Sequence, residues 1–434
     1  MRRWNLSHYV ISSCVATSLL AGCVLRQAQD DVQLPVGAPD AIAQRIRSAS
    51  SSYQVLYSFS GRPDGQSPLA SLVDVKGVLY GTTSRGGKYG YADDKGGTVF
   101  SITTSGTEHV LYSFRKGQPF ASLIDVGDIL YGTTQYGGGG RYGGAGTIFS
   151  ISTSGKERQL YSFQFAYHDG HRPMASLVNA RGPLYGTTSQ GGATTDSGTV
   201  FTITTGGTEN ILHSFGGRLD GDYPEAALID VNGTFYGTTY AGGGSSRCGS
   251  SPGCASGPSS GCFNGCGTVF SVTKGGTEKV LHSFSFGSGD GSLPESSLID
   301  VHGTLYGTTF WGGPGGELGG TVFSITTSGT EKILHDFHGP SDGVLPHGSL
   351  IDVNGTLYGT TEEGGAYGDG TVFSISPYGV EEKVLHSFGS GSDGAYPFGG
   401  LIDVNGTLYG TTAGGGTHTG CFYGGCGTVF ALSL

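Results

Sequence analysis

LIDVNGTLYGTT, at residues 350–361, is the stretch that decides the fold, together with GTVFSIS at residues 370–376. Asn354-Gly355 predicts a two-residue hairpin turn, because both central residues of that turn need a positive φ. β-Branched and aromatic residues on either side of such turns are typical of short strands. We expect four strands in this unit, listed by residue number as 349–353, 356–361, 371–376 and 383–388.

The same unit recurs along the chain. The string Tyr-Gly-Thr-Thr occurs seven times, with its tyrosine at 80, 131, 185, 236, 306, 358 and 409. Seven repeats of four strands predict an all-β, seven-bladed β-propeller over residues 53–434, with a β-solenoid as the alternative. The first unit begins with a fourth-type strand, Val55 to Phe59, and the last ends with a third-type strand, Thr428 to Leu432. We expect these two to pair and close the ring, which leaves no open sheet edge.

Composition excludes several other classes of protein. Glycine makes up 83 of the 434 residues, aromatic residues 11% and charged residues only 13%. This profile is unlike that of a coiled coil, a helix bundle or a charge-rich disordered chain. The net charge of −11 argues against a nucleic-acid partner.

The N-terminus reads as an export signal. Arg2 and Arg3 precede an apolar run that is too short for a permanent membrane span, and Leu20-Ala21-Gly22-Cys23 follows it. This pattern resembles a bacterial lipoprotein signal, so residues 1–22 would be removed and Cys23 lipidated. The resemblance implies an outer-membrane lipoprotein in which residues 23–52 form a tether. An ordinary secretory signal with an incidental cysteine is the alternative.

The repeat LIDVNGTLYGTT…GTVFSIT…VLHSF is similar to the GloVer tandem repeat of bacterial choice-of-anchor proteins, and in outline to a kelch blade. The similarity to GloVer covers about residues 53–434. That family is defined by its repeat and its anchor, so the resemblance implies a fold and a location but no activity.

Six cysteines follow the signal, an even number that favours disulfides in an exported protein. The preferred pairs are Cys248–Cys254, Cys262–Cys266 and Cys421–Cys426, although the four cysteines of the insert allow three pairings. A zinc site is the alternative, but the spacing is not CxxC.

Repeated polar residues are interpreted as structural. An aspartate recurs in the first strand, and we expect it to bond to the adjacent hairpin rather than form a cation-binding ring. Asp-Gly-x-x-Pro recurs between blades as a turn, with calcium binding as a weaker alternative. One outer-strand position holds His213, His282, His335 and His386 in four copies and tyrosine in three. We assign no cofactor and no metal site; the cluster of His335, His338 and His347 is the single exception considered.

Function is sought on the face that carries the long, variable loops, because binding residues concentrate on such loops. Exposed aromatic rings stack on sugars or anchor partners, and packing that stiffens the glycine-rich loops is the alternative role for such rings. The predicted ligand-binding residues are Tyr136, Tyr142, Tyr240, Phe310 and Trp311. We expect a monomeric, non-catalytic binding module for an envelope glycan or protein, attached to the membrane only through its lipid.

An enzyme acting on a polysaccharide is the alternative function. It would need an acid and a base that converge on one face. The acids that break the repeat on the variable face are Asp93, Asp94, Asp196, Glu317, Glu362, Glu363 and Asp369. Burial of Glu362 beside a second carboxylate or a histidine would favour this alternative.

Overall fold

A computed structural model describes residues 52–90, 96–139, 144–166, 168–193, 195–216, 219–244, 265–285, 289–314, 319–389 and 392–434. Residues 51–434 make one compact unit. The export signal, Cys23 and all but the last residue of the expected tether lie outside the described residues. Within the described ranges no helix is both long enough and apolar enough to cross a membrane.

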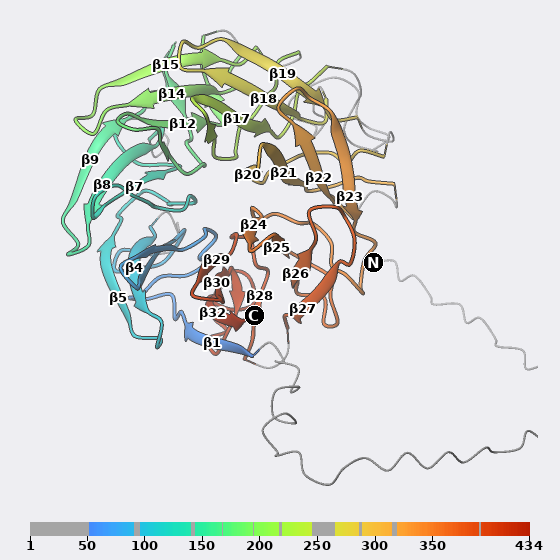
Figure 1. The fold of residues 1–434 in the computed structure, drawn as a ribbon. Helices are drawn as coiled ribbons and strands as arrows, with labels where there is room; N and C mark the ends of the chain where they lie inside the picture. The colour runs from blue at the N-terminus through green and yellow to red at the C-terminus, as the bar shows by residue number, and fades with distance from the viewer. Residues whose placement is uncertain are drawn as a thin grey trace, which may run out of the picture. The chain divides into compact units, whose positions relative to one another are not determined.

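The described residues form seven four-stranded antiparallel sheets, arranged as the blades of a propeller (Figure 1). This confirms the predicted fold class. Blades 1 to 3 comprise β2 (Val73–Val75), β3 (Val78–Thr83), β4 (Thr98–Thr103), β5 (Glu108–Ser113); β6 (Ile124–Asp125), β7 (Ile129–Thr134), β8 (Thr147–Ser152), β9 (Glu157–Ser162); β11 (Val178–Asn179), β12 (Leu184–Thr188), β14 (Thr199–Ile203) and β15 (Glu209–Ser214). Blades 4 to 6 comprise β16 (Ile229–Val231), β17 (Thr234–Thr239), β18 (Thr268–Thr273), β19 (Glu278–Ser283); β20 (Ile299–Val301), β21 (Thr304–Thr309), β22 (Thr321–Thr326), β23 (Glu331–Asp336); β24 (Ile351–Val353), β25 (Thr356–Thr361), β26 (Thr371–Ile375) and β27 (Lys383–Ser387). Two short pairs, β10 (Gly170–His171) with β13 (Gln190–Gly191) and β28 (Gly394–Ala395) with β31 (Gly414–Gly415), lie in the loops.

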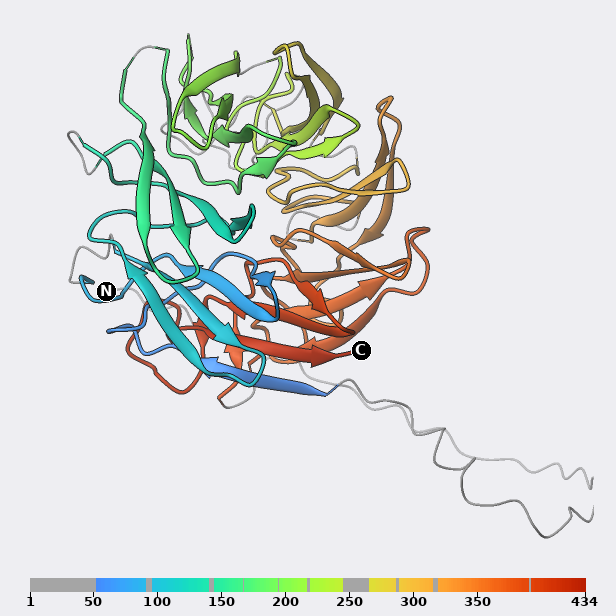
Figure 2. The same ribbon diagram turned by 60° about the vertical axis from the view of Figure 1, so that its left-hand side comes forward.

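Blade 7 joins the two ends of the propeller. It contains β29 (Ile402–Val404), β30 (Thr407–Thr412) and β32 (Thr428–Ser433), and its outer strand is β1 (Tyr53–Ser58) from the start of the described chain. β1 pairs antiparallel with β32, with Tyr53 opposite Leu432 and Ser58 opposite Thr428. Both views show the blue β1 along the red β32 (Figures 1 and 2). The predicted closure of the ring is therefore confirmed.

The Tyr-Gly-Thr-Thr motif packs the second strand inside its blade and against the next blade. A Cβ on Gly359 would lie 2.6 Å from the Phe373 ring and 2.8 Å from Leu350, so only glycine fits there. The first threonine hydroxyl donates a hydrogen bond to a backbone carbonyl at the start of the next blade. These bonds run from Thr82 to Ala121, Thr133 to Ala175, Thr187 to Ala226, Thr238 to Ser296, Thr308 to Pro346, Thr360 to Gly399 and Thr411 to Ala70.

The residue before each inter-blade proline holds the loops around the central channel. Its φ lies between 53° and 59° in all seven copies, which are Ser67, Gln118, Arg172, Tyr223, Leu293, Leu345 and Tyr396. A left-handed backbone is uncommon for such residues, and the position before proline normally favours extended backbone. In this conformation the backbone amide and the backbone carbonyl of the residue form hydrogen bonds with different loops. The Tyr223 amide donates to the Ser197 carbonyl in the preceding blade, and the Tyr223 carbonyl accepts from the Tyr240 amide at 2.9 Å.

The repeated aspartates are structural, as expected. Asp230 and Asp300 each accept a hydrogen bond from the glycine amide of the adjacent hairpin, at 2.6 Å and 2.9 Å. The aspartate of Asp-Gly-x-x-Pro accepts from the backbone at the end of the outer strand, as Asp220 does from the Gly216 amide at 2.9 Å.

One of the predicted disulfides lies within the described residues. Cys421 and Cys426 are bonded, with Cα atoms 4.9 Å apart. Cys266 is also disulfide-bonded. The other three cysteines of the insert, Cys248, Cys254 and Cys262, fall outside the described residues, so their pairing stays a prediction.

Gly359→Ala tests the packing of the repeat motif. We expect a loss of about 1–3 kcal/mol in the free energy of unfolding, because the new methyl group must displace the Phe373 ring. Gly206→Ala is the matched control, since its nearest neighbouring atom lies 3.6 Å away and neither glycine has a left-handed φ. Urea unfolding followed by circular dichroism measures both. Equal stability of the two variants would contradict this account of the motif.

Candidate functional site

The central channel is lined by one short segment from each blade, located just after the inter-blade proline. The residues directly after these prolines are Leu69, Phe120, Met174, Glu225, Glu295, His347 and Phe398. They and their neighbours enclose a pocket of about 100 Å³. Because equivalent residues from all seven blades line this pocket, it lies on the propeller axis.

Blades 4, 5 and 6 place ionisable side chains at this position, whereas the other four blades place apolar ones. Nε2 of His347 lies 2.6 Å from a carboxylate oxygen of Glu295, and both side chains are largely buried. Burial alone would lower the pKa of His347, but the Glu295 carboxylate outweighs it and raises that pKa to about 9. His347 is therefore protonated at neutral pH and donates to the Glu295 carboxyl group.

Glu225 lies in the same pocket but in a different electrostatic state. Burial, and next the negative charge of Glu295, raise the pKa of Glu225 to about 8. At neutral pH the Glu225 side chain is thus mainly protonated and can donate a hydrogen bond, while Glu295 accepts one from His347. The two carboxyl groups in this pocket therefore have different hydrogen-bonding roles, with Glu225 as a donor and Glu295 as an acceptor.

A fourth ionisable group comes from the end of β25. Glu362 follows the Thr-Thr pair of blade 6 and is half-buried. Burial raises the pKa of Glu362 to about 7, with opposing effects from His347 and from the carboxylates of Glu363 and Glu295. The enzymatic alternative requires a buried Glu362 beside a histidine or a second carboxylate; Glu362 is only half-buried, and its pKa responds to His347 and Glu295.

Aromatic rings surround the histidine. Phe398 and Phe310 meet the His347 ring edge-on, at centroid distances of 4.9 Å and 6.0 Å. Tyr240 packs against the same core cluster as Phe310, and burial followed by the charges of Glu295 and Glu225 raises the pKa of its hydroxyl. The hydroxyl of Tyr240 therefore remains protonated.

A second pocket of about 240 Å³ opens beside the first. Its lining includes Arg172, Tyr223 and Tyr240, and it shares Met174 and Glu225 with the axial pocket. The Nε atom of Arg172 is buried without a hydrogen-bond partner, and the guanidinium lies 5.8 Å from the centroid of the Tyr136 ring. The site therefore has acids on blades 4 to 6 and a guanidinium on the entry to blade 3.

The structure locates four of the five predicted ligand-binding residues. Tyr240 lines the second pocket, Phe310 contacts His347, and Tyr136 lies against Arg172. Trp311 is half-buried and stacks on Phe310, with ring centroids 5.9 Å apart, so it is not an exposed anchor. Tyr142 lies outside the described residues.

Glu225 and Glu295 were not among the acids singled out from the sequence. Each of them precedes a first strand, whereas the acids predicted from the sequence lie on loops that follow second strands. A signal for them was present, because the residue after each inter-blade proline varies in an otherwise repeated segment. The residues at this variable position become neighbours in one pocket only when the blades form a ring.

The histidine cluster considered from the sequence does not form. His335 pairs with Asp342, His338 with Asp336 and His347 with Glu295. The outer-strand residues repeat one contact instead, in which His282, His335 and His386 each hydrogen-bond the aspartate that follows in Asp-Gly. Tyr57 makes the same contact with Asp64 at 2.7 Å.

Comparison with known proteins supports the repeat and the fold. The Gloeobacter/Verrucomicrobia repeat matches residues 40–251 and 254–434. The chain belongs to this repeat family. No curated protein matches the sequence of this family member.

Several solved structures resemble the chain at low sequence identity. The extracellular domain of a protein assigned as a one-component system of B. thetaiotaomicron is 9% identical, with a TM-score of 0.52 over 87% of this chain and 40% of that one. The repeat protein thus spans less than half of that relative, and the likeness concerns the fold alone. The periplasmic gluconolactonase of Pseudomonas aeruginosa is 14% identical, with a TM-score of 0.46 over 82% of this chain and 98% of that one. A puromycin-hydrolyzing peptidase of Mycobacterium tuberculosis is 12% identical, with a TM-score of 0.48 over 83% and 53%.

The axial site makes the stability of the protein depend on pH. Raising the pKa of Glu225 from 4.5 to about 8 means that the folded protein keeps a proton that the unfolded chain loses in that interval. His347, raised from 6.5 to about 9, acts with the same sign, because its stabilising proton is fully bound below 6.5 and is lost as the pH passes 9. The free energy of unfolding should therefore fall as pH rises through these windows.

Two variants isolate this effect in thermal unfolding measured across a pH series. Glu225→Gln should flatten the decline between pH 4.5 and about 8, and His347→Phe should remove the decline between 6.5 and about 9. Phenylalanine already occupies the equivalent position in blades 2 and 7. Glutamates on the outer strands also have raised pKa values, so each variant is compared with the parent protein. Parallel curves for parent and variants would show that the axial groups do not titrate in this way.

Proposed function

We propose that this repeat protein is a cell-envelope lipoprotein whose propeller binds a hydroxyl-rich glycan at the axial pocket. The observation that carries the proposal is the replacement of apolar residues by Glu225, Glu295 and His347 in three adjacent blades. Leu69, Phe120, Met174 and Phe398 show that the fold does not need ionisable groups at this position. Partly buried charges are costly, and their gathering in one pocket favours a functional role.

The chemistry of the pocket suits a sugar. Glu225 offers a proton, Glu295 accepts hydrogen bonds, and His347 fixes the orientation of Glu295. Phe398 and Phe310 add apolar surface next to these polar groups. Sugars present hydroxyl groups at the edge of the ring and C–H groups on its face, so a pocket of this kind complements both. A protein partner would more readily use the exposed loop aromatics, such as Phe422.

Ligand binding is expected to depend on the acids of the axial pocket. Glu225→Gln and Glu295→Gln should each weaken binding of an envelope polysaccharide by about tenfold or more, since each leaves a buried hydrogen-bonding group unpaired. Trp311 is one of two tryptophans in the chain, and it stacks on Phe310, so its fluorescence reports on the site. Asp352→Asn, an exposed change on a first strand, is the control. Glycan binding that survives both glutamate variants would place the site elsewhere, and a protein captured through Phe422 would favour the protein ligand.

A polysaccharide-acting enzyme is the second candidate, because one pocket holds both Glu225, whose raised pKa favours a protonated carboxyl group, and Glu295, which accepts from His347. A proton donor and a proton acceptor that converge in one pocket are the arrangement that general acid–base catalysis uses. Release of reducing ends from the same polysaccharide distinguishes the two functions. An enzyme would lose turnover in Glu225→Gln but retain binding, whereas a binding module would release no reducing ends at all.

The location is proposed from the N-terminal sequence. The string Leu20-Ala21-Gly22-Cys23 supports lipidation at Cys23 and attachment to the outer membrane, with the propeller held as a monomer on its tether. Cys23→Ala should move the protein from the membrane fraction to the soluble fraction, because the acyl chains provide the membrane affinity. Separation of cell envelopes by centrifugation, with immunodetection of the propeller, measures this. An unchanged membrane fraction would argue against the lipid anchor.

A further inference from the structure

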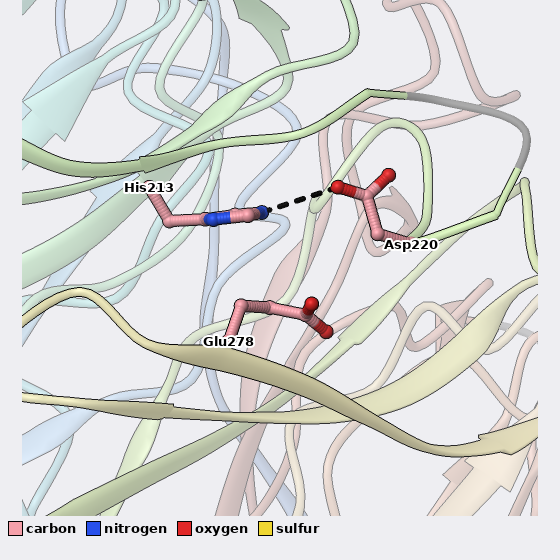
Figure 3. A group of neighbouring side chains, drawn as sticks. All are labelled: His213, Asp220 and Glu278. Atoms are coloured by element: carbon pink, nitrogen blue, oxygen red, sulfur yellow. Dashed lines mark ion pairs between the residues drawn. The ribbon is translucent and has the colours of Figure 1, made fainter.

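The seam between the outer strands of blades 3 and 4 contains a group that differs from its copies elsewhere. His213 lies on β15, Asp220 on the loop that follows it, and Glu278 is the first residue of β19 in the neighbouring blade (Figure 3). Nε2 of His213 and one carboxylate oxygen from each acid all lie within 4.8 Å of one another. Among the described residues this is the one group of three or more such side chains with that spacing.

The corresponding histidines in three other blades have ordinary hydrogen-bond partners. His282, His335 and His386 direct Nε2 to Asp290, Asp342 and Asp393 at 2.9–3.2 Å. In the blade 3 copy, Nε2 of His213 forms an ion pair with Asp220 at 3.3 Å but is buried without a hydrogen-bond partner. Oε1 of Glu278 is also buried without a hydrogen-bond partner, as is Oε1 of the equivalent Glu108, Glu209, Glu331 and Glu382. Unlike His282, His335 and His386, His213 therefore has an Nε2 atom without a hydrogen bond, a state that native proteins seldom leave uncompensated.

A bound cation would satisfy all three groups. In a tetrahedral zinc site the ligand atoms lie about 2.0–2.2 Å from the metal, and hence about 3.3 Å from one another. The 3.3 Å between Nε2 of His213 and Oδ2 of Asp220 already has this value. The imidazole is fixed by the edge-on packing of its ring on Phe215, at a centroid distance of 4.8 Å. A small movement of the Glu278 side chain would complete the set.

We propose that His213, Asp220 and Glu278 form a binding site for a divalent first-row transition metal ion, such as Zn²⁺. One imidazole nitrogen and two carboxylate oxygens favour zinc and its neighbours over Ca²⁺ or Mg²⁺, which prefer oxygen ligands alone. Three protein ligands leave a coordination position for water. The ion would join the outer strands of two adjacent blades, far along the chain from the disulfide between Cys421 and Cys426.

The repeat itself supplies well-matched variants for the test. Tyrosine stands at the position of His213 in the first three copies of the repeat, as Tyr57, Tyr112 and Tyr161, so His213→Tyr should fold. His282→Tyr makes the same change in the next seam, where the histidine already has its hydrogen bond. Glu278→Gln is a second site variant that keeps the shape of the side chain.

Isothermal titration of the full-length protein with Zn²⁺, without reductant so that the disulfides stay closed, provides the measurement. We expect saturable binding of one ion and a rise in the melting temperature, because a ligand that binds only the folded state stabilises it. His213→Tyr should abolish both effects, Glu278→Gln should weaken binding by about tenfold or more, and His282→Tyr should leave binding unchanged. Circular dichroism confirms that each variant is folded.

The visible spectrum of the Co²⁺-loaded protein identifies the ligands. Nitrogen and oxygen ligation without a thiolate charge-transfer band supports the site, whereas such a band would assign the metal to cysteines. The proposal is overturned by an absence of binding, by binding that His213→Tyr does not change, or by an equal loss in His282→Tyr.

Discussion

The hydrogen bond from a second-strand threonine to the start of the next blade is the contact on which the propeller depends. It recurs at every blade junction, and the bond from Thr411 to Ala70 makes it cyclic. Each such bond is buried, so losing one would leave a carbonyl unsatisfied in the interior. Ring closure adds the pairing of β1 with β32, which removes the two free edges that a linear array would expose.

This repeated framework leaves certain positions free to vary. Three residues hold the channel segment in place in every blade. They are the proline, the residue with a left-handed backbone before it, and the glycine that ends the preceding loop. The Cβ that Gly370 lacks would lie 2.6 Å from Cδ of Pro397, which shows how closely these parts pack. The side chain after the proline bears none of these contacts, so Leu, Phe, Met, Glu and His all occur there. Departures from the repeat at this position therefore reflect the chemistry of the channel and not the needs of the fold.

Two clusters of ionisable side chains stand out among the described residues, and these clusters arise from the repeat in different ways. The axial group of Glu225, Glu295 and His347 results from residues that change between blades, and its charges interact because the blades converge on the axis. The seam group of His213, Asp220 and Glu278 uses residue types that most blades share, but its geometry differs from that of its copies. A small shift at one seam thus separates a hydrogen-bonded histidine from an ion-paired histidine whose Nε2 lacks a hydrogen bond.

The sequence by itself determined the blade count, the strand order, the Asn-Gly hairpins and the closure by β1, because each depends on local residue patterns repeated seven times. It also placed Cys421 beside Cys426 and identified Tyr240 and Phe310 on the variable face. The axial cluster was decided only by the tertiary structure, because Glu225, Glu295 and His347 are separated in sequence by whole blades and meet only when the ring forms. The environment of Trp311 was also decided by the tertiary structure. Its indole is partly buried because it packs on Phe310, and the variability of its position in the repeat did not indicate this contact. Local patterns specify which strands form and pair, whereas convergence on an axis, with the burial and charge coupling it produces, exists only in the closed propeller.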